Sequence, residues 1–176
     1  MYNLTSPGHC RSFDNMIDQV QRSVRKKDAT SVPFPITRNL KFIGYNKSDS
    51  IVLGNCGNAT LIARGTFQLS GIIFGRQSTF EIDIDGIGSI SFKGRCKNII
   101  INSISGQCTL DLSDVACRSV TCLSASGKST ILFGRTKVIK QLVIGNDTVV
   151  RYKGKPKLVE HSITENARFE EITVAA

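Results

Sequence analysis

Three carboxylates occupy alternate positions in one short stretch of the chain: Glu81, Asp83 and Asp85. The two residues between them are isoleucines. In an extended strand alternate side chains share a side, so the three acids are expected on one outward face. A row of this kind binds a cation or pairs with basic neighbours, and carboxylates on the outside of carbohydrate-cleaving enzymes do acid–base work. Because the chain has little loop length to build a cleft, a solvated face is the favoured interpretation.

Histidine and cysteine form neither a metal site nor a nucleophilic set in the sequence. The only histidines are His9 and His161, and none of the six cysteines belongs to a CxxC pair. Structural zinc needs four such ligands at short spacing, and a Ser/His/Asp set needs a histidine close to both partners. No metal and no cofactor are therefore expected.

The tripeptide Gly127-Lys128-Ser129 has the residue types that end a phosphate-binding loop. That motif requires a glycine five residues before Gly127, where this chain has Cys122. It also requires a helix immediately afterwards, whereas residues 130–133 have the character of a strand. The phosphate-loop interpretation is rejected.

The chain is strongly basic, with 23 Lys and Arg against 14 Asp and Glu and a formal net charge of +9. A basic surface attracts nucleic acid, anionic lipid or an acidic protein. The basic residues are spread over several short groups. Two groups are singled out as candidate interaction residues: Arg25, Lys26 and Lys27, and Lys153, Lys155 and Lys157. Further groups are Lys93, Arg95 and Lys97, and Lys137 and Lys140. No aromatic-rich stacking motif of the RNA-binding type accompanies them.

The elements that would position these residues come from a repeat of about 20 residues. Its blocks are 89–108, 109–129, 130–149 and 150–169. Each block opens with an alternating apolar pair: Ile90/Phe92, Leu110/Leu112, Ile131/Phe133 and Val150/Tyr152. A second pair follows a turn: Ile99/Ile101, Val120/Cys122, Leu142/Ile144 and Val159/Ile163. Short strands at a fixed period indicate a solenoid in which each coil buries its apolar face against its neighbours.

The fold class predicted from this pattern is all-β, a right-handed parallel β-helix over residues 40–176. An antiparallel β-sandwich is the alternative, since short strands with frequent turns also describe it. Residues 1–39 form a separate arm. Within it, apolar residues recur at helical spacing over about 12–28, which predicts an amphipathic helix, and 29–39 is a Pro-containing connector. The helix is expected to cap the open end of the solenoid, and binding a partner is its other role.

The repeat also suggests what the cysteines do. Cys96 and Cys117 lie 21 residues apart, nearly one repeat, and are expected to stack in adjacent coils. Cys122 falls where neighbouring blocks carry Ile101 and Ile144, which predicts a buried thiol acting as a small hydrophobe. Reduced, structural cysteines are favoured over disulfides.

At the blocks 89–169 the sequence resembles the head, GIN-type domain of putative auto-transporter adhesins. The resemblance rests on the closing segment Val150-Arg151-Tyr152-Lys153-Gly154-Lys155-Pro156 and on three Gly-bearing turns. These turns are Ile104-Ser105-Gly106, Ala125-Ser126-Gly127 and Ile144-Gly145-Asn146. The resemblance implies a right-handed β-helix that is usually exported by bacteria, with no established catalytic activity and with a surface or adhesive role. The chain departs from it in lacking a leader and in its last turn, Thr164-Glu165-Asn166.

Three function classes follow. The first is a non-enzymatic structural or interaction protein that presents a rigid surface, adhesin-like or as a small subunit of a virion or multi-subunit complex. The second is a basic nucleic-acid-binding protein, whose affinity would fall steeply with salt. The third is a carbohydrate-active β-helix enzyme centred on Asp83 and Asp85 or on Asp111 and Asp114.

A protein partner or assembly neighbours are expected first, with nucleic acid or a glycan as the other candidate partners. No apolar run is long enough for a transmembrane helix, and the N-terminus lacks the basic-then-apolar order of a secretory signal. The location therefore stays open between a cell surface and the interior of a cell or virion, and the oligomeric state stays open as well.

Overall fold

The computed structural model describes residues 2–3, 34–35, 40–42, 47–54 and 58–172, with side chains placed for 58–73 and 78–172. Nine strands make up this part: β1 (Tyr2–Asn3), β2 (Phe34–Pro35), β3 (Leu40–Phe42), β4 (Lys47–Gly54), β5 (Ala59–Ala125), β6 (Thr130–Ile144), β7 (Val149–Lys153), β8 (Lys157–Ile163) and β9 (Arg168–Glu171). The described part of the chain contains no helix that could cross a membrane. The helix expected over 12–28 lies outside the described residues, as do Arg25, Lys26 and Lys27.

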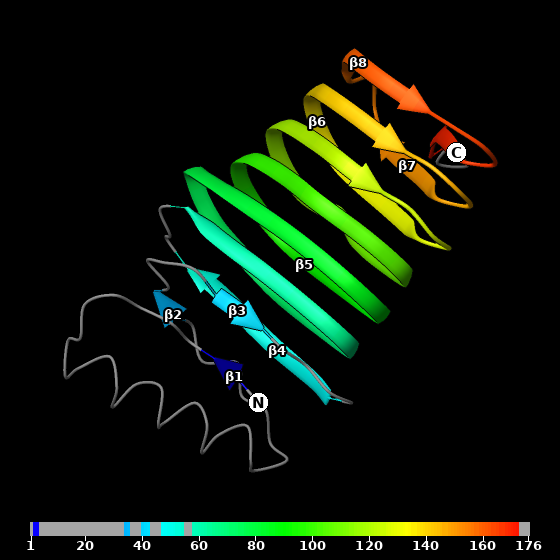
Figure 1. Ribbon diagram of the computed structural model, residues 1–176. Coiled ribbons are helices and arrows are strands. Elements are labelled where there is room, and N and C mark those ends of the chain that lie inside the picture. The colour runs from blue at the N-terminus through cyan, green and yellow to red at the C-terminus, as the bar shows by residue number, and fades with distance from the viewer. Residues whose placement is uncertain (1, 4–33, 36–39, 43–46, 55–57, 173–176) are drawn as a thin grey trace.

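The strands form a right-handed parallel β-solenoid, as the repeat predicts. The chain winds in successive coils from the N-terminal to the C-terminal end (Figure 1). Strand β6 pairs in parallel with β5 on one side and with β7 and β8 on the other, and β9 pairs in parallel with β7. Two residues of the expected connector, Phe34 and Pro35, belong to this sheet because β2 pairs in parallel with β4.

The register between coils follows the apolar pairs that the sequence predicted for the first strand of each block. Leu110 pairs with Ile131, and Ile131 pairs with Val150, so these positions form one inward row. All three side chains are 0% exposed. Fully burying an aliphatic side chain contributes about 1.5–3 kcal/mol, so each coil is held mainly by the coil before and after it.

The second strands of the later coils depart in part from the predicted pairing, although Ile144 pairs with Ile163 as expected. Val120 pairs with Ile139, and the partner of Cys122 is Leu142 rather than Ile144. In the last coil the inward position belongs to Leu158, which pairs with Ile139. Val159, expected inside, is 54% exposed. The register shift between Val120 and Thr121 inserts one extra residue into β6, and a bulge of this kind moves all later side chains relative to a fixed period.

The three expected Gly-bearing turns are corners of the coils. The turns at 125–127 and 144–146 fall where β5 gives way to β6 and β6 to β7, as predicted, whereas segment 104–106 lies inside β5, which runs through several coils without a break. One corner carries a positive φ angle in coil after coil, at Gly65, Gly86, Gly106, Gly127, Asn146 and Glu165. In its satisfied orientation the Asn146 amide accepts a hydrogen bond from the Gly127 backbone nitrogen at 3.3 Å and donates to the Glu165 carboxylate. These six positions form a continuous row along one corner of the solenoid, although Asn146 and Glu165 replace glycine in the last two coils.

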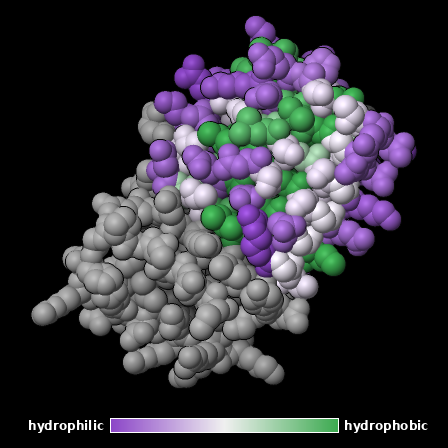
Figure 2. All heavy atoms as spheres, in the orientation of Figure 1, coloured by the Kyte–Doolittle hydropathy of each residue, from purple (hydrophilic) through white to green (hydrophobic). Residues whose placement is uncertain are grey.

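The interior of the solenoid is apolar and tightly filled. Phe80 and Phe92 meet edge to face with ring centroids 5.2 Å apart, a favoured arrangement for aromatic pairs. A few buried hydroxyl groups are satisfied by carbonyls of adjacent turns, as where Ser129 Oγ donates to the Ser126 oxygen at 3.2 Å and Thr148 Oγ1 to the Gly127 oxygen at 3.3 Å. On the face shown in Figure 2, hydrophobic atoms gather toward the middle and hydrophilic atoms along the rim.

The last coil is less covered than the others. Its inward positions are taken by Leu158, His161 and Ile163, which pair with the buried Ile139, Leu142 and Ile144 respectively. His161 is exposed and Ile163 is 39% exposed, whereas Leu142 and Ile144 are at most 1% exposed. No strand of the described chain pairs with the outer edge of β8 or β9.

Candidate interaction surface

One edge of the solenoid carries basic side chains in register on consecutive coils. Cys117 pairs with Thr136 and Ser119 pairs with Val138, which places Arg118 opposite Lys137. Both side chains are exposed, while Cys117 beside Arg118 is buried. The alternation of the strand therefore turns both cations outward at the same point of successive coils.

The same row continues one coil earlier at Lys97. The Ser119 hydroxyl donates to Asn98 Oδ1 at 2.8 Å, and Asn98 directly follows Lys97 in the chain. Cys96, which directly precedes Lys97, is buried, and burial raises the pKa of its thiol to about 12, with a further contribution from the Cys117 sulfur of the next coil. The Ser119–Asn98 hydrogen bond joins residues 21 apart, so Lys97 lies one coil before Arg118 in the row.

A second row runs beside the first. Arg95 and Arg135 are exposed and stand two residues before Lys97 and Lys137. In the intervening coil the corresponding residue is Ala116. We call the set Arg95, Lys97, Arg118, Arg135 and Lys137 the basic ridge. Since parallel strands lie about 4.8 Å apart, the ridge places a cation on each of three coils within about 10 Å along the solenoid axis.

The cations of the basic ridge make no ion pair with any carboxylate in the described part of the chain. The ion pairs formed there join Arg64 to Asp83, Arg151 to Glu170 and Lys153 to Asp114. Neighbouring like charges that are not neutralised raise the local positive potential, which favours an anionic partner. The ridge therefore differs from Arg64, Arg151 and Lys153, whose charges face a carboxylate.

The predicted interaction residues of the last coils lie next to the ridge but differ among themselves. Lys153 pairs with Arg135 in register, yet its ammonium group donates to the Ser113 carbonyl at 3.2 Å and lies 3.9 Å from Asp114. Lys155 is exposed in the segment between β7 and β8, and Lys157 is exposed at the start of β8. Lys153 is thus partly neutralised, and the other two extend the positive edge toward the C-terminal end.

The carboxylate row lies on the wall that β8 completes, as expected of an outward face, and two of its acids contact side chains of neighbouring coils. Asp83 accepts from Arg64 at 2.8 Å and from the Ser103 hydroxyl at 2.5 Å, and Asp85 accepts from Ser105 at 2.7 Å. Partial burial raises the pKa of Asp83, but the hydrogen bonds from Arg64 and Ser103 and the charge of Arg64 outweigh it and leave the pKa below its ordinary value. An acid held ionised in this way is suited to a structural role rather than to proton donation.

The acids named for the carbohydrate-cleaving alternative do not gather around one point. Asp111 lies in the row Asp111–Leu132–Arg151, on the wall formed by β7 and β9, and its carboxylate accepts from the Ser113 backbone nitrogen at 2.9 Å. Asp114 is exposed beside Lys153. Asp83 and Asp85 are on the other wall. In the described residues, no group of three or more His, Cys, Asp or Glu side chains is arranged to hold a metal ion.

The cysteines of the described residues are free thiols inside the solenoid: Cys96, Cys108, Cys117 and Cys122. Their neighbours are hydroxyl groups and apolar side chains. Cys117 Sγ lies 3.2 Å from Thr136 Oγ1, and Cys108 Sγ lies 3.5 Å from Ser129 Oγ. Burial raises the pKa of Cys122 to about 12 despite weak hydrogen bonds to the backbone. Thiols of this kind are packing residues, as predicted. Cys10 and Cys56 lie outside the described residues.

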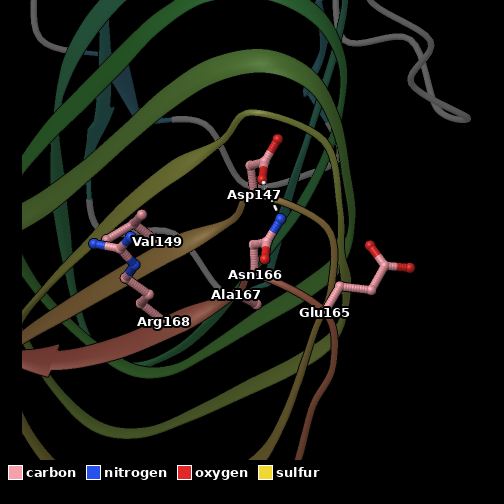
Figure 3. Close-up of a pocket in the computed structure, with 6 residues that line it drawn as sticks. All are labelled: Asp147, Val149, Glu165, Asn166, Ala167 and Arg168. Carbon is pink, nitrogen blue, oxygen red and sulfur yellow. Dashed lines mark hydrogen bonds between the residues drawn. The ribbon is translucent and has the colours of Figure 1, made fainter.

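An open depression of about 610 Å³ lies on the corner of the last two coils, where β7 and β9 begin. Figure 3 shows Asp147 and Asn166 side by side, with Glu165 directed away from them and Arg168 on the other side. Asn166 Nδ2 donates to Asp147 Oδ1 at 3.3 Å. The carboxylates of Asp147 and Glu165 do not converge, and the depression lies at the end of the row of corner residues.

Comparison with known proteins adds no relative: no family model matches the chain, and neither a curated protein nor a solved structure matches it.

In the sequence, Lys97 and Lys137 belong to separate short basic groups that are not adjacent to each other. Arg118 belongs to no such group. The signal that identifies the ridge is the spacing of these three residues, 21 and 19, which is close to the repeat of about 20 residues. A charge that recurs with the period of a solenoid forms a straight row on its surface.

Proposed function

We propose that this protein is a non-enzymatic binding module that presents the basic ridge, on a rigid β-solenoid, to an acidic partner. The observation that carries the proposal is the alignment of Lys97, Arg118 and Lys137 on three consecutive coils with no carboxylate partner in the described residues. It supports the leading sequence hypothesis of a scaffold protein and assigns that scaffold a surface.

The rigid backbone beneath the ridge favours binding because little of it has to be ordered. The backbone on both sides of each cation is hydrogen-bonded into parallel strands. A partner therefore meets charges at a fixed spacing and orders only the ends of the side chains, which keeps the entropy cost of association low. An adhesin-like module at a cell surface and a subunit of a larger assembly would both use the ridge in this way, and the two versions differ only in the partner.

The test is retention on immobilised heparin, a soluble polyanion used here as the probe. The ridge variant Lys97→Gln/Arg118→Gln/Lys137→Gln removes three charges. The control variant Lys128→Gln/Arg151→Gln/Arg168→Gln also removes three from the formal net charge of +9, at exposed positions away from the ridge. Circular dichroism establishes that both variants are folded.

The ridge variant is expected to elute at clearly lower salt than the control variant, because adjacent charges act together on one polyanion. Equal elution of the two variants would mean that only net charge matters, and the proposal would then be wrong.

A further inference from the structure

We infer that the anionic partner of the basic ridge is double-helical nucleic acid, bound through its phosphate backbone without readout of the bases. This inference rests on the proposed function and names the partner class. Three observations carry it: the composition of the surface around the ridge, the position of the aromatic side chains, and the spacing of the cations.

The surface around the ridge is polar rather than apolar. The large hydrophobic side chains exposed in the described residues are Ile87, Leu123, Val159 and Ile163. None belongs to the rows 95–97, 116–118 and 135–137 that form the ridge. Protein–protein interfaces have an apolar, aromatic-rich centre depleted of charge, whereas protein–nucleic acid interfaces are polar and strongly positive. The composition therefore favours nucleic acid over an acidic protein.

The aromatic side chains favour a duplex over a single strand. Proteins that hold single strands stack the bases on exposed aromatic rings. Here Phe67, Phe80, Phe92 and Phe133 are at most 2% exposed. Tyr152 and Phe169 stack on each other with ring centroids 4.4 Å apart at the last coils. In the part of the chain with described side chains, no ring is offered beside the ridge, so the partner must carry its bases already stacked.

The cations are close enough together to reach neighbouring phosphates, which follow every ~3.4 Å of helix axis along each DNA strand. Coils separated by about 4.8 Å present Lys97, Arg118 and Lys137 as three point contacts along one line, with Arg95 and Arg135 beside them. Guanidinium groups bind phosphate oxygens in bidentate fashion, and lysine contributes a point charge. With roughly three to five phosphates neutralised, the logarithm of the binding constant is expected to fall with the logarithm of salt concentration with a slope of about −3 to −5.

The test uses fluorescence anisotropy of the full chain with a labelled DNA duplex of ~20 base pairs, about two helical turns, titrated between about 50 and 200 mM salt. A second duplex of scrambled sequence and a single strand of equal length serve as comparison probes. We expect equal affinity for the two duplexes and weaker binding of the single strand. The ridge variant should bind the duplex roughly 10-fold to 100-fold more weakly, with a slope about three units shallower. The control variant should lose far less.

The other outcomes are distinguishable. Ridge-dependent retention on heparin without duplex binding would overturn the nucleic-acid inference and leave the binding module standing. Displacement of the duplex by poly-glutamate at equal charge concentration would identify an acidic protein as the better partner, and preferential binding to vesicles of anionic lipid would identify a membrane. Tighter binding of the single strand would overturn the duplex assignment. Equal behaviour of the ridge and control variants on heparin would remove the proposed function and this inference together.

Discussion

The backbone of Gly106 passes so close to the carbonyl of Gly86, one coil earlier, that a β-carbon on Gly106 would lie 2.2 Å from that oxygen. The φ angle of Gly106 is also positive, at 95°. Glycine is therefore required here for two separate reasons, conformation and space. The chain offers a control that separates them, because Gly154 has a similar φ of 85° and a β-carbon added to it would meet nothing within 4 Å.

Replacing these two glycines with alanine should give different losses of stability. Gly154→Ala incurs the conformational penalty alone, about 1–2 kcal/mol. Gly106→Ala adds a clash with backbone that cannot move without shifting a coil, so its loss should exceed that of Gly154→Ala by at least ~1 kcal/mol. Urea unfolding followed by circular dichroism measures both. Equal losses would show that the coils adjust to the added methyl group.

The ion pair of Asp83 should make stability depend on pH in the acid range. Its pKa is lowered in the folded state, so the stabilisation is present above the ordinary carboxylate pKa of about 3.9 and is lost as pH falls through the lower folded value. Asp83→Asn is expected to unfold more easily than the wild type at pH 7, by roughly 1 kcal/mol because the pair is partly exposed. The difference should shrink toward pH 2.

Asp85→Asn is the matched control for this pH experiment, since Asp85 accepts from Ser105 at 2.7 Å and takes part in no ion pair among the described residues. Its effect at pH 7 should be smaller than that of Asp83→Asn. A penalty for Asp83→Asn that is the same at pH 7 and at pH 2 would contradict the assigned role of Arg64.

The buried thiols should resist alkylation in the folded protein. The pKa values of Cys96 and Cys122, each raised to about 12 by burial, leave almost no thiolate at pH 8, and thiolate is the reactive form. Iodoacetamide at pH 8 followed by peptide mass mapping should leave both residues unmodified in native protein and modified in guanidinium. Rapid modification of Cys122 without denaturant would place it outside the core.

Two isoleucines at the same register position should differ in their contribution to stability. Ile144 is 1% exposed and Ile163, its partner one coil later, is 39% exposed. Ile144→Ala is expected to cost about 2–5 kcal/mol, as for other buried aliphatic truncations, and Ile163→Ala less than about 1 kcal/mol. Thermal or urea unfolding of the two variants measures the difference. Similar costs would indicate that the last coil is covered in solution.

The parts of the fold that follow from periodicity were predictable. Alternation places Leu110, Ile131 and Val150 in one row, and the structure confirms it. The parts that depend on bulges were not. The extra residue in β6, Lys140, lies opposite Val159 in β8, so the inward position of the last coil falls to Leu158, opposite Ile139, and not to Val159.

The candidate surface was predictable only in fragments. Its residues were grouped by closeness in the sequence, which finds Lys153, Lys155 and Lys157. The ridge joins residues about 20 apart and depends on the register between coils. The row of acids was easier, because Glu81, Asp83 and Asp85 belong to one strand. The ion pair of Asp83 with Arg64 and the hydrogen bonds from serines of the next coil to Asp83 and Asp85 depend on that register again.

The last coil is thinly covered, so local stability is expected to increase from this end of the solenoid toward its interior. Each coil is stabilised chiefly by its two neighbours, and the coil of β8 and β9 has only one neighbour among the described strands. Its backbone amides should exchange with solvent before those of β6, and those of β6 before the interior of β5, in a gradient along the axis. Unfolding would then proceed coil by coil from this end. The ridge begins one coil further in, at Lys137, so its cations would lose their fixed spacing only after the terminal coil has unfolded.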